Sequence, residues 1–225
     1  MRLSGIAFDA FGTLFDLGAL RARAQDAVGD RGADLQDAFI ARLVPSTWHA
    51  TAAGKYRPFP ELAVLALRAA AREVELDLTE AQASGIAAGL SSLPPYPDAD
   101  DALAKLEAYE LAVLSNGTRE GIESLVAAAG LSHRFAHLLV ADEVRRFKPA
   151  PEVYAQAPAA FGAPADSVLL VSGNGWDVAG AKLAGLRAAW ISHGRRATGF
   201  LGVEADVTAE RLSDLPDAVR RLESS

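Results

Sequence analysis

The chain has 225 residues, half of them hydrophobic and 23% charged, with a formal net charge of −7 and a sequence pI near 5.1. This acidic balance, without a basic cluster, argues against nucleic acid or an anionic membrane surface as a partner. The sequence contains no cysteine, which excludes disulfides, thiolate nucleophiles and cysteine-ligated metals.

The sequence also gives no sign of membrane insertion or export. No apolar run approaches the roughly 18–20 residues of a membrane span. At the N-terminus, Asp9 and Asp16 interrupt any candidate signal peptide. We therefore expect a cytoplasmic protein without membrane contact.

Short apolar runs alternate with helical patterns along most of the chain. One helix is predicted over 120–129, where Ile122, Leu125 and Val126 mark one face and Gly130 follows as a stop signal. Apolar runs without polar alternation suit strands that are covered on both faces, so the sequence predicts an α/β fold with a doubly wound parallel sheet. The predicted strands are 6–8, 111–114, 138–140, 168–171 and 188–191.

One region departs from this alternation. From about Leu17 to Leu93 only alanine-rich helical patterns are found, and the stiff sequence Pro94-Pro95-Tyr96-Pro97 follows. An unusual crossover between strands is one interpretation, but nearly eighty residues is long for a crossover. We expect a helical cap over the sheet, at 17–96, inserted into a core made of 1–16 and 97–225.

Polar residues follow four of the predicted strands. The first strand leads to Asp9 and Thr13, and the second to Ser115-Asn116-Gly117-Thr118. The third leads to Lys148-Pro149, and the fourth to Ser172-Gly173-Asn174-Gly175-Trp176-Asp177. Taken singly, these could be turns, a solvated lysine and a helix cap. Together they favour a site, because ligands of open parallel sheets bind beyond the carboxyl ends of the strands.

These four segments resemble the motifs of the haloacid dehalogenase superfamily, over essentially the whole chain. "DAFGTLFD", "LSNG", "FKPAPEVY" and "VSGNGWD" are similar to the four motifs of its L-2-haloacid dehalogenase branch. The resemblance implies a Rossmann-like core, a helical cap and a nucleophilic aspartate at Asp9. It also implies a small 2-haloacid substrate, and dimers are common among such relatives, which leaves a homodimer open.

Phe11 indicates which reaction of the superfamily to expect. Its phosphatases carry a second aspartate at this position, which protonates the leaving group, and a Gly-Asp pair that binds Mg²⁺ where this chain has Gly173-Asn174. Losing both carboxylates weakens a Mg²⁺ site and removes a general acid, a group commonly worth roughly 10²–10⁴ in rate. A halide leaves as a stable anion and needs no proton. We therefore expect a halide-displacing hydrolase without metal or cofactor.

The resemblance assigns roles to individual residues. Asp9 attacks C2 of the substrate, and water then hydrolyses the resulting ester at the Asp9 carbonyl carbon. Backbone N–H groups of the Ala10–Gly12 turn and Ser115 hold the substrate carboxylate, while Asn116 and the cap contact the halide. Catalytic roles are expected for Asp9, Thr13, Lys148, Ser172, Asn174 and Asp177. Substrate-binding or supporting roles are expected for Ala10, Phe11, Ser115, Asn116, Arg42, Phe59, Tyr154 and Trp176.

The cap departs from the branch's pattern at one position. In the well-known dehalogenases a cap arginine upstream of a Thr/Ser-Trp pair contacts the halide, and counting back from Thr47-Trp48 reaches Ile40. Arg42 lies about 200° further around a helix, so a pocket role and a solvated surface position both stay open. Three alternatives also remain: opening of a strained ring such as azetidine-2-carboxylate, a Mg²⁺-dependent phosphatase, and an inactive protein that binds small acids.

Overall fold

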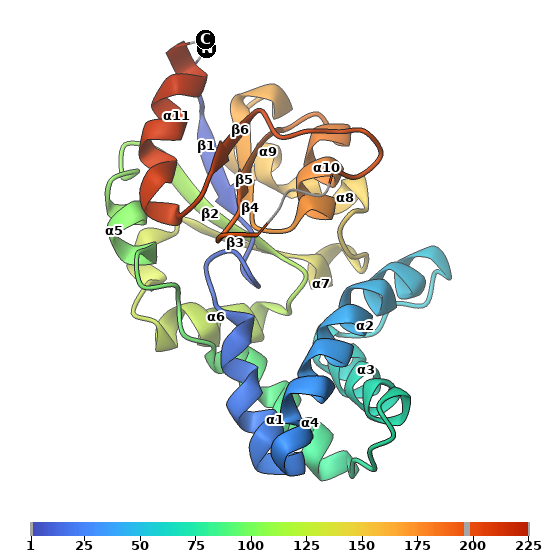
Figure 1. The fold of residues 1–225 in the computed structure, drawn as a ribbon. Helices are drawn as coiled ribbons and strands as arrows, with labels where there is room; N and C mark the ends of the chain where they lie inside the picture. The colour runs from blue at the N-terminus through green and yellow to red at the C-terminus, as the bar shows by residue number, and fades with distance from the viewer. Residues whose placement is uncertain (1, 196–198, 225) are drawn as a thin grey trace.

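The computed structural model describes residues 2–195 and 199–224. At its centre lies a six-stranded parallel sheet in the order β3-β2-β1-β4-β5-β6 (Figure 1). From β1 the chain adds strands outward on one side, then crosses back and continues from β4 on the other. The order therefore reverses between β1 and β4, which is where open α/β sheets bind ligands. The strands are β1 (Gly5–Phe8), β2 (Glu110–Ser115), β3 (His137–Val140), β4 (Val168–Ser172), β5 (Arg187–Ile191) and β6 (Val207–Ala209).

The central strands are buried on both faces, as their unbroken apolar sequences predict. Every residue of β1 and of β4 is buried. The five predicted strands are confirmed. The edge strand β6 is not anticipated by the sequence, because it has only three residues and Thr208 at its centre is exposed.

Helices cover both faces of the sheet. The predicted helix after the second strand is confirmed as α6 (Arg119–Ala128): the Thr118 side chain accepts a hydrogen bond from Gly121 N at its start, and Gly130 adopts a φ of 70° just beyond its end. The other helices of this part are α5 (Ala99–Ala104), α7 (Ala141–Val144), α8 (Pro151–Tyr154), α9 (Gln156–Phe161), α10 (Gly175–Leu183) and α11 (Leu215–Ser224).

A helical bundle lies between β1 and β2 in sequence and beside the sheet in space (Figure 1). We call residues 17–96 the cap; their division from the core as a separate domain stays a prediction. Within the described residues, no helix has the length and apolar character needed to cross a bilayer. The cap helices are α1 (Leu20–Val28), α2 (Gly32–Ala52), α3 (Phe59–Glu73) and α4 (Glu80–Ala88).

Two short chain segments connect the cap to the core, and they lie side by side. Asp16 N donates to Pro94 O at 3.0 Å, and Tyr96 N donates to Leu14 O at 2.9 Å. An antiparallel bridge pairs Phe15 with Pro95 between these two hydrogen bonds. The cap therefore leaves and rejoins the core at one place, directly after β1.

Aromatic rings fill the seam between cap and core. The Tyr56 and Phe59 rings of the cap lie 5.1 and 6.4 Å from the Phe147 ring of the core. Phe59 also stacks on Phe11 at 5.3 Å. Alternating cap and core rings thus form an apolar row, which excludes water from this side of the sheet edge.

Candidate active site

Asp9 directly follows β1, at the point where the strand order reverses. Its backbone N–H donates to Val171 O of β4 at 2.9 Å, which fixes the residue between the two central strands. The next residues form a tight turn in which Leu14 N and Phe15 N both bond to Ala10 O at 3.0 Å. Gly12 has a φ of 73°, a conformation that glycine adopts without steric cost. This turn returns Thr13 to the carboxylate of Asp9.

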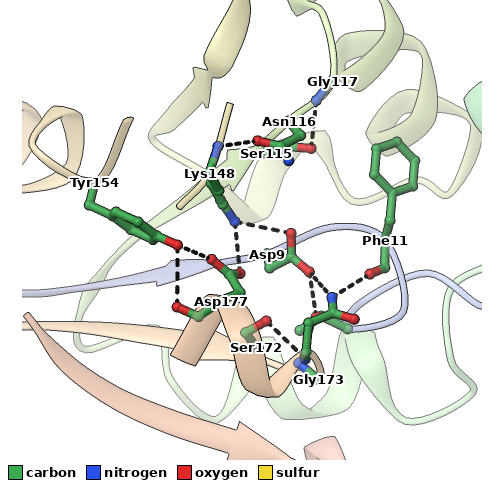
Figure 2. A network of polar contacts seen from close by, with 12 residues as sticks. Asp9, Phe11, Ser115, Asn116, Gly117, Lys148, Tyr154, Ser172, Gly173 and Asp177 are labelled. Atoms are coloured by element: carbon green, nitrogen blue, oxygen red, sulfur yellow. Dashed lines mark hydrogen bonds and ion pairs between the residues drawn. The ribbon is translucent and has the colours of Figure 1, made fainter. Parts of the chain in front are cut away.

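The Asp9 carboxylate is held through both of its oxygens. Lys148 Nζ lies 3.1 Å from Oδ1 (Figure 2), while Thr13 Oγ1 donates to Oδ2 at 2.7 Å and Asn174 Nδ2 at 2.9 Å. Asn174 Nδ2 also donates to Phe11 O at 3.0 Å and so ties the fourth loop to the first. Asp9 is only 5% exposed. These contacts fix the direction of its carboxylate in a nearly dry environment.

Lys148 is fully buried and lies between two carboxylates. Its Nζ is 3.1 Å from Asp9 Oδ1 and 2.9 Å from Asp177 Oδ2 (Figure 2). Its backbone N–H donates to Asn116 Oδ1 at 2.8 Å, so the loop after β2 positions the loop after β3. Burial by itself would lower the pKa of the Lys148 ammonium, but the charges of Asp177 and Asp9 outweigh it and hold the pKa above its ordinary value.

Asp177 contacts this lysine, and Tyr154 in turn contacts Asp177. Tyr154 Oη donates to Asp177 Oδ1 at 2.7 Å, which leaves Oδ2 for Lys148 (Figure 2). Burial raises the pKa of Asp177, against the opposing charge of Lys148, and burial raises the pKa of Tyr154 well above its ordinary value. Tyr154 is completely buried. Tyr154 is therefore positioned to hold Asp177. Of the substrate-binding and supporting roles considered for it, the structure favours the supporting one.

Serine and glycine shape the loops around the nucleophile. Ser115 Oγ accepts a hydrogen bond from Gly117 N at 3.1 Å, and Ser172 Oγ accepts one from Asn174 N at 3.1 Å. Gly173 N donates to Thr13 Oγ1 at 2.8 Å. A Cβ at Gly173 would lie 2.2 Å from Gly12 O, so only glycine fits between the first and fourth loops. Ser172 thus shapes the loop that aims Asn174 at Asp9.

The turn after Asp9 narrows the choice of backbone donors for an anion. Gly12 N donates to Phe15 O at 2.8 Å within the turn, so it is already used. The expectation that the Ala10–Gly12 turn binds a carboxylate therefore reduces to Ala10 and Phe11 as candidate donors. The Ser115 hydroxyl, which accepts from Gly117, keeps its own proton to donate.

Arg42 requires a correction. It lies on α2, is exposed, and pairs with Glu73, the last residue of α3. The first residue of α3, Phe59, stacks on Phe11 beside the site. A helix of this length spans roughly 20 Å, so Arg42 is anchored at the far end of the cap. Of the two positions that the sequence left open for Arg42, the structure has the solvated one, because α2 turns Arg42 to solvent. Ile40 is half-buried in the cap.

The predicted aromatic residues do lie at the seam. The Phe11 ring points away from the Asp9 carboxylate (Figure 2) and packs on Phe59. Trp176, at the start of α10, packs edge-on against Trp48 of α2 at 5.7 Å. Trp48 Nε1 is buried, and within the described part of the chain it has no hydrogen-bond partner.

His193 was not predicted as a residue near the site. Its Nε2 lies 3.0 Å from Thr13 O, and its ring stacks on Tyr96 at 3.8 Å. Burial lowers the pKa of His193, which favours the neutral ring. His193 thus joins the loop after β5 to the turn that carries Thr13. Its position just after a predicted strand could have pointed to the site, but a single histidine was not enough to predict a role.

The donor set around Asp9 is poor in carboxylates. Across the two described ranges, no group of three or more His, Asp or Glu side chains is arranged to hold a metal ion. Phe11 offers only a backbone carbonyl, which Asn174 already occupies. The site can therefore supply a held carboxylate, a buried ammonium and neutral hydrogen-bond donors.

Comparison with known proteins agrees with this geometry. A family described as haloacid dehalogenase-like hydrolase matches residues 3–185. The chain is 34% identical to the (S)-2-haloacid dehalogenase of Pseudomonas sp. (strain YL), covering 84% of this chain and 83% of that one. It is 32% identical to haloacetate dehalogenase H-2 of Moraxella sp. (strain B), covering 92% and 93%.

A solved structure shares the whole architecture. The L-2-haloacid dehalogenase of Xanthobacter autotrophicus superposes with a TM-score of 0.91 at 30% identity, covering 97% of this chain and 99% of that one. Another structure of that protein, with chloropropionic acid covalently bound, also superposes with a TM-score of 0.91. The sheet, the cap and the loops at the sheet edge are thus shared with a protein that forms a covalent adduct.

Proposed function

The chain belongs to the haloacid dehalogenase-like hydrolases, and we propose that it converts (S)-2-haloalkanoic acids to 2-hydroxyalkanoic acids through an ester on Asp9. Relatives that match over most of the chain are (S)-2-haloacid dehalogenases. The observation that carries the proposal is the buried Asp9–Lys148 pair beside Phe11, a carboxylate held for attack with an aromatic ring in place of a second carboxyl group.

In the first step an Asp9 oxygen attacks C2 of the substrate from the side opposite the halogen. A C–O bond forms as the C–halogen bond breaks, and the electron pair leaves with the halide, so C2 is inverted and no proton is transferred. The Lys148 ammonium and the hydroxyl of Thr13 orient the carboxylate. Because the site is nearly dry, the nucleophile carries little water that must be removed before attack.

In the second step water attacks the carbonyl carbon of the Asp9 ester. Negative charge develops on the Asp9 oxygen that is not bonded to the substrate. Each Asp9 oxygen has a donor for that charge, Lys148 Nζ at 3.1 Å from Oδ1 and Asn174 Nδ2 at 2.9 Å from Oδ2. The tetrahedral intermediate collapses, and the bond from the Asp9 carbonyl carbon to the product oxygen breaks. One proton of the water passes to that oxygen, and the other is released to solvent. Asp9 is regenerated with one new oxygen atom.

The substrate carboxylate is assigned to the turn after β1 and the loop after β2. The backbone N–H groups of Ala10 and Phe11 and the hydroxyl of Ser115 are its proposed donors. Asn116 uses its carbonyl oxygen on Lys148 N, which leaves its amide N–H₂ as the proposed halide donor. Phe59 and Trp176 provide apolar surface around the reacting carbon.

The test is halide release after chelator treatment, measured on chloroacetate, bromoacetate and both enantiomers of 2-chloropropionate. We expect release from the (S) enantiomer, none from Asp9→Ala, and no change with chelator. In single turnover in ¹⁸O-water, the label should enter a peptide containing Asp9 before it enters the product. Chelator-sensitive hydrolysis of p-nitrophenyl phosphate without halide release would instead identify a phosphatase.

A second candidate shares the Asp9 ester and differs in the leaving group. Arg42 is paired with Glu73 on the cap surface, and Ile40 stands at the position of the halide-binding arginine, so neither position supplies a guanidinium for a halide. Opening of a strained ring such as azetidine-2-carboxylate needs no halide cradle. Ring-opened hydroxy amino acid, formed without activity on haloacids, would establish this candidate.

The location and the assembly of the protein are further parts of the proposal. We propose that the enzyme acts in the cytoplasm, which its composition favours, and as a homodimer, which the resemblance to dehalogenases implies. Light scattering on the purified protein tests the dimer: a mass near that of a single 23.6 kDa chain would overturn it.

A further inference from the structure

A mainly apolar cavity lies between the cap and the core beside the active site. Its volume is about 240 Å³, and it is bordered by α3 and α4 on the cap side and by the start of α6 on the core side. Ligand sites are typically concave and mostly apolar, with few polar groups. We call this cavity the alkyl pocket; its walls include Phe11, Phe59, Val64, Ala88, Gly117 and Ile122.

Two wall residues connect the alkyl pocket to the reacting groups. Phe11 is two residues after Asp9, and its ring points away from the Asp9 carboxylate and stacks on Phe59 in the pocket wall (Figure 2). Gly117 donates its N–H to Ser115 Oγ and lines the same cavity. The pocket is therefore next to the residues proposed to bind the substrate carboxylate.

We propose that the alkyl pocket receives the hydrocarbon chain on C2 of the substrate, so that this enzyme prefers 2-haloacids with chains of several carbons. The inference rests on the proposed function. With the substrate carboxylate at the first and second loops and C2 at Asp9, the chain passes between the Phe11 ring and Gly117. A cavity of this size has room for a chain of several carbons.

The walls fit such a chain better than a polar ligand. The pocket is formed largely by aromatic, aliphatic and small side chains, and no Lys, Arg, Asp or Glu is among its lining residues. Its hydroxyl groups are those of Ser84, Ser91 and Thr118, and Thr118 Oγ1 already accepts from Gly121 N. Burial of each methylene is worth about fourfold in an equilibrium constant. Chain length is therefore the property that this cavity can select.

The experiment compares kcat/KM for (S)-2-bromopropionate, 2-bromobutanoate, 2-bromohexanoate and 2-bromooctanoate. In the wild type we expect a rise of about fourfold per methylene until the cavity is filled. Ala88→Phe fills the pocket from an exposed position at the end of α4, and it should abolish the rise while leaving 2-bromopropionate within about twofold. Ser84→Phe, one helical turn earlier on the same face, should do the same.

Ala22→Phe is the matched control, because Ala22 is an exposed alanine of the cap helix α1 outside the pocket. It should keep the chain-length profile of the wild type. A flat or falling profile in the wild type, or an unchanged profile in both filled variants, would overturn the alkyl pocket. Equal slowing of all substrates by Ala88→Phe would also overturn it and indicate a passage for product or water. If no bromide is released even from bromoacetate, the proposed function has failed instead.

Discussion

Replacing Lys148 by methionine isolates the contribution of the buried ammonium. Methionine is close to lysine in length and apolar, so it fills the same space without the charge. Lys148 is the shared partner of Asp9 at 3.1 Å and of Asp177 at 2.9 Å, with all three side chains at most 7% exposed. The substitution leaves two carboxylates close together in a dry site with no cation between them.

The expected loss of stability is large for a single residue. Breaking a buried ion pair by removing one partner costs about 3–5 kcal/mol, out of a total that is typically about 5–15 kcal/mol. With a urea slope of roughly 3 kcal/mol per molar, the unfolding midpoint should fall by about 1–1.7 M. The rate should fall by about 10²–10³ or more, because a donor aimed at the developing charge is removed.

The assays are urea unfolding followed by circular dichroism, and halide release on (S)-2-chloropropionate. Lys148→Met combined with Asp177→Asn is the informative double variant, since it removes one of the unpaired charges. We expect it to recover part of the stability and none of the activity. If Lys148→Met unfolds at the wild-type urea concentration and keeps its rate, the ammonium does not hold the carboxylates together and the reasoning is wrong.

Three further predictions concern Thr13, the pH dependence of Lys148 and Tyr56 at the seam. Thr13→Val keeps the shape but removes the donor to Asp9 Oδ2 and the acceptor of Gly173 N; kcat should fall by roughly 10–100-fold, with Thr13→Ser close to wild type. The neighbouring carboxylates raise the pKa of Lys148 above 10.5, so the stability it contributes is complete below about pH 10.5 and lost as pH rises through the raised value. The test is the free energy of unfolding, measured from about pH 9 to about pH 12. The difference between wild type and Lys148→Met should stay constant up to about pH 10.5 and narrow only above it. Tyr56→Phe removes the hydrogen bond to Asp142 across the seam; hydrogen exchange in α3 should accelerate, with a loss of about 1 kcal/mol in stability, and unchanged exchange would contradict a closing role for this bond.

The sheet and the four loops could be predicted because each rests on local sequence. An uninterrupted apolar run such as 168–171 specifies a strand that is covered on both faces, and the parallel order then brings every strand end to one edge. Asp9, Lys148 and Asp177 are far apart in sequence, yet they meet because each directly follows or neighbours such an end. These residues are brought together by the parallel sheet topology, and the apolar runs in the sequence predict that topology.

The contacts made by the cap could not be predicted in the same way. The direction of Arg42 depends on how α2 turns against α3, and a helical pattern gives the buried face without giving the partner. Glu73 attracts Arg42 from the end of a neighbouring helix, thirty-one residues later in the chain. The same limit applies to His193, whose contact with Thr13 O spans 180 residues and leaves no trace in either segment.

The paired connections at Asp16–Pro94 and Leu14–Tyr96 have a consequence for motion. Because both lie beside the turn that carries the nucleophile, any swing of the bundle has its pivot there. Points near a pivot move least, so we expect a movement of the bundle to leave Asp9 and Thr13 in place beside Lys148 and to displace the outer end of α3, roughly 20 Å beyond Phe59, much further. Opening of the cap would then leave the alignment of the nucleophile undisturbed.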